Sequence, residues 1–145
     1  MNTTRRLIGG LLLAWLARPL VALANWNQEA FGAKTAADAL KSLGAAGATA
    51  SKEILIEAPQ IAENGAVVPI EVSSAVPGTS ALIVLIEKNP FPLAARFDFR
   101  DGALPYAKLN VKMGETSDIR VLAEAAGKYF SATKEVKVTI GGCGG

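Results

Sequence analysis

The centre of the chain carries the apolar run Leu82-Ile83-Val84-Leu85-Ile86. The run is short and rich in branched residues, and turn signals bound it at Pro77-Gly78 and at Asn89-Pro90. An apolar run without alternation is typical of a strand that is covered on both faces. We therefore expect a buried strand at this place.

On both sides of this run, short segments carry the apolar pattern of strands. They are residues 54–56, 68–72, 95–99, 107–113, 119–123, 128–132 and 136–140. Pro69 indicates an edge strand or a bulge, because proline cannot donate to a sheet. About seven or eight strands with turns between them predict a mainly β fold, an immunoglobulin-like antiparallel β-sandwich. The chain has one cysteine, so it lacks the disulfide of antibody domains and the likeness is one of architecture.

Residues 27–43 are expected to form one N-terminal helix that packs across one end of the β-domain. Phe31, Ala37, Leu40 and Leu43 recur at near-helical spacing on one side of it. Gly44 is a suitable C-terminal stop. A partner-binding helix is the alternative interpretation. Residues 44–51 are all small and predict a linker.

Residues 1–24 have the pattern of an export signal peptide. Arg5 and Arg6 give a positive start, a short apolar stretch follows, and Ala22-Leu23-Ala24 is an A-x-A cleavage site. The paired arginines indicate the twin-arginine route, with an ordinary secretory signal as the alternative. We expect a periplasmic product with a β-sandwich domain over residues 25–140 and a flexible arm over residues 141–145. No later segment is long enough to span a membrane.

The composition excludes several classes of function. Without residues 1–24 the chain has 12 basic and 13 acidic residues, a net charge of −1, and no basic cluster indicates nucleic acid. It contains no histidine, so histidine-based catalysis and histidine metal sites are excluded, and one cysteine cannot build a zinc or iron–sulfur site. No nucleotide or haem motif is present. We expect no cofactor, no metal and no catalytic residue, and hence a protein that is not an enzyme on its own.

The chain ends in Gly141-Gly142-Cys143-Gly144-Gly145, which places its only cysteine between two glycine pairs. Glycine leaves the backbone nearly unrestricted, and this ending offers no apolar side chain that could dock. Three extended residues beyond Ile140 reach about 10 Å, enough for the thiol to enter a cleft on another protein. We expect Cys143 to be the reacting group on a swinging arm formed by Gly141, Gly142, Gly144 and Gly145. An incidental thiol on a frayed tail is the alternative.

Two further stretches stand out beside the ending, Glu63-Asn64-Gly65-Ala66-Val67-Val68-Pro69 and Glu87-Lys88-Asn89-Pro90. With them the chain resembles the SoxY family, the sulfur-carrier subunits of the bacterial thiosulfate-oxidising Sox system. The resemblance implies that Cys143 holds sulfur adducts derived from thiosulfate, and that the carrier forms a heterodimer with SoxZ, a smaller β-sandwich subunit. It also implies three transient partners: the c-type cytochrome SoxAX, the hydrolase SoxB and the sulfane dehydrogenase SoxCD.

Two other functions stay open. One is an immunoglobulin-like periplasmic binding module whose Cys143 forms a static disulfide with a partner, or links two copies of the chain. The other is a carrier activated at its terminal Gly-Gly carboxylate, as in ubiquitin-like sulfur carriers. Export away from ATP, and a sandwich pattern in place of a β-grasp pattern, argue against the latter.

Overall fold

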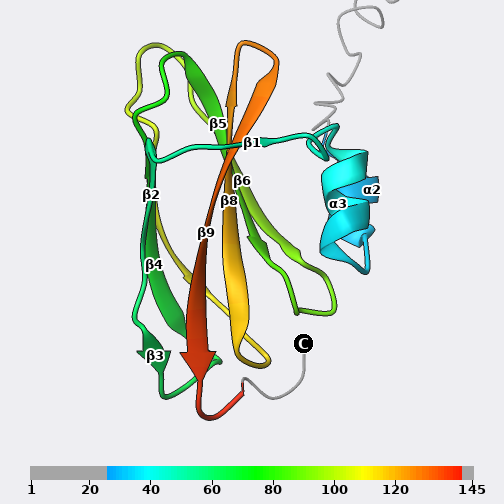
Figure 1. Ribbon diagram of the computed structural model, residues 1–145, viewed down its shortest axis with the longest axis vertical. Coiled ribbons are helices and arrows are strands. Elements are labelled where there is room, and N and C mark those ends of the chain that lie inside the picture. The colour runs from blue at the N-terminus through cyan, green and yellow to red at the C-terminus, as the bar shows by residue number, and fades with distance from the viewer. Residues whose placement is uncertain (1–25, 142–145) are drawn as a thin grey trace, which may run out of the picture.

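Two facing sheets and a pair of helices make up the fold (Figure 1). The computed structural model describes residues 26–141. The expected signal peptide 1–24, its cleavage site, and Gly142, Cys143, Gly144 and Gly145 lie outside the described residues. The mainly β prediction is confirmed, and the immunoglobulin-like topology stays a prediction.

The larger sheet has six strands in the order β1-β9-β8-β5-β6, and β3 also pairs with β9. Neighbours among β5, β6, β8 and β9 are antiparallel, whereas β1 lies parallel to the start of β9 and β3 parallel to its end. The strands are β1 (Thr49–Ala50), β3 (Ile61–Ala62), β5 (Thr79–Ile86), β6 (Leu93–Asp98), β8 (Ser117–Ala125) and β9 (Lys128–Val138).

The smaller sheet has the antiparallel order β2-β4-β7, with strands β2 (Ile54–Glu57), β4 (Val68–Ser74) and β7 (Tyr106–Val111). The prediction of an edge strand or a bulge at Pro69 is wrong for β4 as a whole, because β4 is the central strand of this sheet. Pro69 pairs with Asn110 of β7, but the pairing with β2 reaches only as far as Glu71. The proline therefore lies where β4 has a neighbour on one side only, and its missing N–H costs no hydrogen bond on the other.

The central run on β5 is covered on both faces, as predicted. Leu82, Val84 and Ile86 lie in the core between the two sheets, and Ile83 and Leu85 lie in a second core under the helices. All five side chains are fully buried. Because side chains alternate along a strand, one apolar run serves both cores.

The prediction of one helix over residues 27–43 is wrong, since the structure has α2 (Gln28–Gly32) and α3 (Ala36–Ser42). Thr35 lies between them in extended backbone, and its side chain accepts a hydrogen bond from the Asp38 N–H, which caps α3. Because the break separates the two helices, the buried side of α3 is not the side expected for one continuous helix. Ala39 is buried and Ala37 is exposed. Gly44, at φ 72°, follows α3 as the expected stop.

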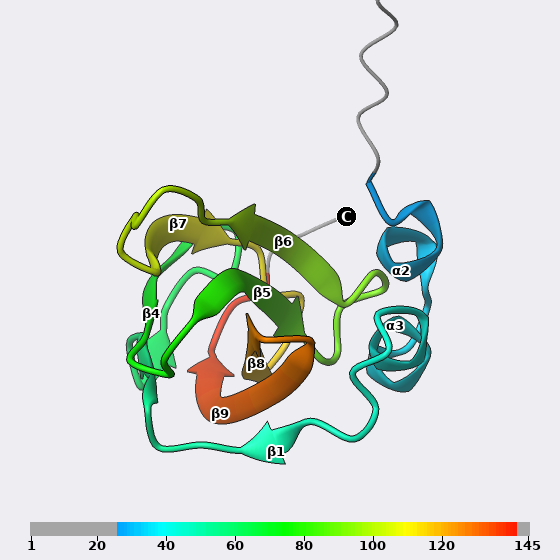
Figure 2. The same cartoon turned by 90° about the horizontal axis from the view of Figure 1, so that it is seen from above.

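The helix pair covers the outer face of β5 and β8, where Ile83, Leu85 and Leu122 meet Ala30 and Ala39. It does not lie across one end of the domain, as the sequence suggested, and Figure 2 shows it on the side of the larger sheet away from the smaller one. Among residues 26–141, neither helix is long and apolar enough to cross a membrane.

Three strand assignments also differ from the prediction. The expected linker 44–51 contains β1, and the short strand β3 was not anticipated. The segments 128–132 and 136–140 are not separate strands, because β9 runs unbroken from Lys128 to Val138. Strands of two residues are too short to show a period, which is why the sequence did not reveal β1 and β3.

Candidate functional site

The candidate site is the end of the sandwich at which β9 stops and the chain continues through Thr139 and Ile140 to Gly141. Three loops lie at this end (Figure 1). They are residues 63–67 between β3 and β4, residues 87–90 between β5 and β6, and residues 112–116 between β7 and β8. We call these three loops the collar.

The backbone that leaves β9 is tied to the collar as far as Ile140. The Gly65 N–H donates to the Ile140 carbonyl oxygen at 2.8 Å. The Thr139 N–H donates to the Ala62 carbonyl at 3.1 Å, and the Thr139 hydroxyl donates to the Glu63 carbonyl at 3.2 Å. The first segment beyond the strand therefore has a fixed course.

The loops of the collar are also joined to one another, mainly through Asn89. Its amide nitrogen donates to the Lys112 carbonyl at 2.7 Å, and its amide oxygen accepts from the Gly114 N–H at 3.2 Å. The Met113 N–H donates to the Gly65 carbonyl at 2.7 Å. The two stretches that the sequence analysis selected, 63–69 and 87–90, thus meet around the base of the ending.

Local chemistry shapes each of these loops. The Asn64 side chain accepts from the Ala66 N–H at 2.9 Å, which forms the tight turn that buries Gly65. The Glu87 carboxylate accepts from Arg120 Nε at 2.6 Å, and both side chains are half-buried. This ion pair fixes the start of loop 87–90 on β8.

Gly141 lies against the backbone of Gly114. A Cβ placed on Gly141 would lie 2.1 Å from the Gly114 carbonyl oxygen and 3.2 Å from its carbonyl carbon. Real side chains do not approach backbone so closely, so residue 141 must be glycine for this contact. Sequence reasoning selected Gly141 for conformational freedom and missed both this contact and the part that Gly114 and Asn89 play in it.

Cys143, Gly142, Gly144 and Gly145 lie outside the described residues, so the geometry of the site is described as far as Gly141. Within residues 26–141, no group of three or more histidine, cysteine, aspartate or glutamate side chains is placed to hold a metal ion. In the same part of the chain every buried side-chain nitrogen and oxygen has a hydrogen-bond partner. What the described site offers is a set of loops that fix where the ending leaves the fold.

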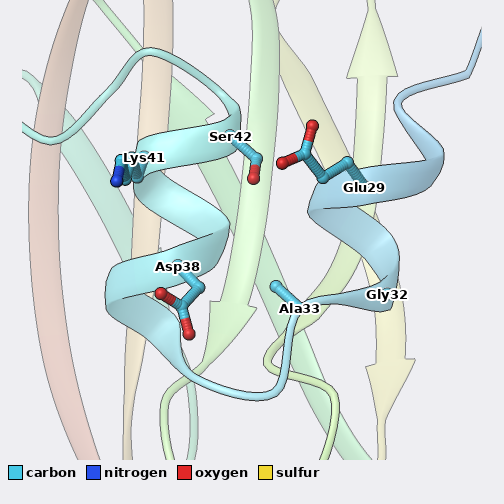
Figure 3. A pocket seen from close by; sticks show the side chains of 6 residues that line it. All are labelled: Glu29, Gly32, Ala33, Asp38, Lys41 and Ser42. Carbon is cyan, nitrogen blue, oxygen red and sulfur yellow. The ribbon is translucent and has the colours of Figure 1, made fainter.

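A hollow of about 590 Å³ lies between the two helices, and Figure 3 shows the residues that line it. Glu29 on α2 points across the gap toward Ser42 at the end of α3, while Asp38 lies near the start of α3. The Asp38 carboxylate already accepts from the Thr35 hydroxyl at 2.7 Å. The hollow is lined by residues of the helix pair, and Figure 1 shows these helices beside the larger sheet, away from the end at which β9 stops.

Comparison with known proteins decides the family. A family model described as sulfur oxidation protein SoxY matches residues 40–143. The chain belongs to the SoxY family. A solved structure, the sulfur carrier protein SoxY from Chlorobium limicola f thiosulfatophilum, is similar to it with a TM-score of 0.67 and 35% sequence identity, over 78% of this chain and 99% of that one.

Two other comparisons add nothing to the SoxY assignment. An engineered protein matches with a TM-score of 0.41 and 16% identity, over 60% of this chain and 20% of that one, which carries no argument. A comparison with curated proteins found no match. The SoxY match confirms the resemblance drawn from the three stretches, and it spans all three loops of the collar. Membership of this family implies partners within the Sox system.

Proposed function

We propose that this chain carries sulfur intermediates covalently on Cys143 during bacterial thiosulfate oxidation. One observation carries the proposal: the SoxY match extends to residue 143, which is the only cysteine of the chain. The similar solved structure, which is named a sulfur carrier, supports the same role. In this role the chain is a substrate holder for other enzymes and not a catalyst.

Loading is an oxidation. The sulfur of Cys143 forms a disulfide bond with the outer sulfur of thiosulfate, the thiol proton is released, and two electrons pass to a c-type cytochrome, SoxAX. The hydrolase SoxB then directs water to the terminal sulfonate. The bond between the two thiosulfate-derived sulfurs breaks, sulfate leaves, and one sulfur stays on Cys143 as a persulfide. SoxCD takes electrons from the outer sulfur while water supplies oxygen, which converts that sulfur to a sulfonate. Hydrolysis then breaks the sulfur–sulfur bond, releases a second sulfate and frees the thiol.

The sequence around Cys143 suits delivery to such enzymes. An ordinary free thiol is on the order of a few per cent ionised at neutral pH, so we assign activation of the thiol to the receiving active site. Gly142 and Gly144 add no side-chain width, which favours passage through a narrow channel. In this proposal residues 141–145 act as a swinging arm that is anchored at Gly141, where the chain packs against Gly114.

The proposal includes a partner and a compartment. The chain works as a heterodimer with SoxZ, the smaller β-sandwich subunit, and reaches the periplasm by the twin-arginine route. That route transports folded proteins, and the sequence shows no cofactor motif that would require assembly in the cytoplasm. A folded partner without its own signal explains the choice of route.

Cys143→Ser tests the carrier role in a reconstituted system with thiosulfate and the cytochrome. Electron transfer to the cytochrome should fall to the level without carrier, while the heterodimer forms as before. Intact-mass spectra of the wild-type protein should show a thiosulfate-derived adduct on Cys143. Wild-type turnover by the serine variant, or adduct mass at another residue, contradicts the proposal. A thiol found only in a stable disulfide with a partner supports the static binding module instead.

A further inference from the structure

Exposed apolar side chains gather at the end of the sandwich that carries the collar. Four of the eight large apolar side chains that are exposed among the described residues lie there: Ile61 at 57%, Val67 at 56%, Phe91 at 50% and Ile140 at 68% exposure. We call these four residues the rim. Exposed apolar side chains that concentrate in one region mark interaction surfaces more often than scattered ones do.

The rim residues belong to segments that are bonded to one another around residues 139–141. Ile61 pairs with Lys137 where β3 runs beside the end of β9. Val67 closes loop 63–67, in which the Gly65 N–H donates to the Ile140 carbonyl. Several backbone groups of these segments are taken up by these hydrogen bonds, whereas the four apolar side chains are exposed and available to a partner.

Phe91 extends the rim toward the helices. It follows Asn89 and Pro90 in the connection between β5 and β6, and the Lys34 ammonium lies 3.5 Å from the centre of its ring. This cation–π contact holds the ring in place on the surface, where it stays half exposed. A ring fixed in this way can be covered by a partner at little cost in conformational entropy.

The short ending sets how near a partner must come. Cys143 is two residues beyond Gly141, so its α-carbon lies within about 7 Å of the Gly141 α-carbon even when the chain is fully extended. An active site that receives the thiol must bring its entrance within that reach. Its entrance then covers the end of the sandwich around Gly141, where Ile140 precedes Gly141 and the other rim residues lie at the same end.

We propose that Ile61, Val67, Phe91 and Ile140 form the docking surface for the enzymes that receive Cys143, and that it fits an apolar wall around the entrance of their active-site clefts. This inference rests on the proposed carrier function. Because each enzyme of the cycle receives the same thiol through the same short ending, one surface serves them all in turn. The rim therefore raises the chance of productive insertion and leaves the chemical step to the enzyme.

The test uses the full mature chain in its heterodimer, with thiosulfate and the purified cytochrome as the probe. Val67→Glu and Ile61→Glu should raise the KM for the carrier by about fivefold or more, the size of effect given by the minority of interface residues that carry most of the binding energy, with kcat unchanged. Val67→Lys should act in the same direction, because either charge is costly against an apolar wall. Leu104→Glu is the matched control. Leu104 is 83% exposed, and it lies in the β6–β7 loop beside Pro105, whose carbonyl meets β4 at the opposite end of the sandwich.

A small thiol reagent should modify Cys143 at the same rate in all variants, which shows that the ending itself is unchanged. If the cytochrome loads the wild-type chain but the rim variants and Leu104→Glu have equal KM values, the docking surface is overturned. The carrier function would still stand in that case. A weakening by Glu but not by Lys at Val67 would overturn the apolar character of the contact. A wild-type chain that the cytochrome never loads would overturn the carrier function, and the docking surface with it.

Discussion

The α-carbon of Gly141 faces the Gly114 carbonyl oxygen so closely that a methyl group on it would lie 2.1 Å from that oxygen. The neighbouring hydrogen bonds leave little room for adjustment, because the Asn89 side chain accepts from the Gly114 N–H and the Ile140 carbonyl accepts from the Gly65 N–H. Gly141 is therefore required for close packing at the point where the ending leaves the fold. This requirement differs from conformational freedom, and the two can be separated by experiment.

Gly141→Ala should destabilise the domain by about 1–3 kcal/mol, since the new methyl group forces backbone apart in a packed region. Thermal and urea unfolding of the purified protein measure the effect. The control is Gly47→Ala, because a Cβ at Gly47 meets nothing within 4 Å. If alanine at 141 leaves both the Tm and the turnover of the reconstituted system at wild-type values, the contact has no role.

Asn89→Ala should loosen the collar, because it removes the donor to the Lys112 carbonyl and the acceptor for the Gly114 N–H. We expect a loss of about 1–3 kcal/mol in the free energy of unfolding. Amide hydrogen exchange at Gly114 should become faster, which a loss of stability elsewhere would not cause selectively. Asn110→Ala changes an exposed asparagine on β7 and serves as the control. Unchanged exchange at Gly114 would show that Asn89 does not hold this loop.

The outer face of the smaller sheet carries a charge cluster whose titration can be predicted. The hydrogen bond from Lys108, at 2.6 Å, and then that from the Tyr106 hydroxyl, at 2.7 Å, hold the pKa of the Glu71 carboxyl below its ordinary value. The same contact raises the pKa of Lys108. Because the folded-state pKa of Glu71 is lowered, its contribution to stability is present above the unfolded-state pKa and is lost as the pH falls through the folded-state value.

Lys108→Met should therefore move the pKa of Glu71 upward, toward its ordinary value. An NMR pH titration of the Glu71 carboxyl carbon checks this, with Lys52→Met, a change of an exposed lysine elsewhere, as the control. The change in stability should be small, since exposed ion pairs contribute little. The same titration curve before and after Lys108→Met would contradict the assignment.

If the proposed joint export is right, replacing Arg5 and Arg6 with lysine should strand both this chain and its proposed partner SoxZ in the cytoplasm. The change keeps the positive charge that a secretory signal needs but removes the arginine pair of the twin-arginine signal. Fractionation followed by intact-mass measurement of both proteins provides the readout. Periplasmic product from the Lys-Lys chain indicates the secretory route, and a partner that reaches the periplasm without this chain rules out joint export.

How far the sequence predicts this fold depends on the length of each pattern. The run 82–86 identified the central strand and its two covered faces, because five apolar residues in a row allow little else in a chain of short strands. The prediction of a single helix failed at Thr35. In the sequence Thr35 looks like an ordinary polar residue, and its role as the cap of α3 is clear only once α2 is known to end at Gly32 and Ala33. The misplaced phase then put Ala37 in the core instead of Ala39.

The candidate site, like the fold, could be predicted only in part. The sequence singled out Cys143 and its glycines directly, and the stretches 63–69 and 87–90 through their resemblance to the SoxY family. It did not show that the loops surround the ending, because that follows from the order of the strands. Gly114 carried no signal of its own, and its contact with Gly141 depends on two loops more than 20 residues apart.

The pairing of β9 has a mechanical consequence. At its end this strand lies between β8 and β3, and its hydrogen bonds to both run across the direction of the chain. A pull on Gly141 along the strand therefore loads these bonds in shear, so that several must break together. In the proposed carrier cycle, tension from an enzyme that draws the thiol into its cleft passes into these bonds, which resist the unravelling of β9.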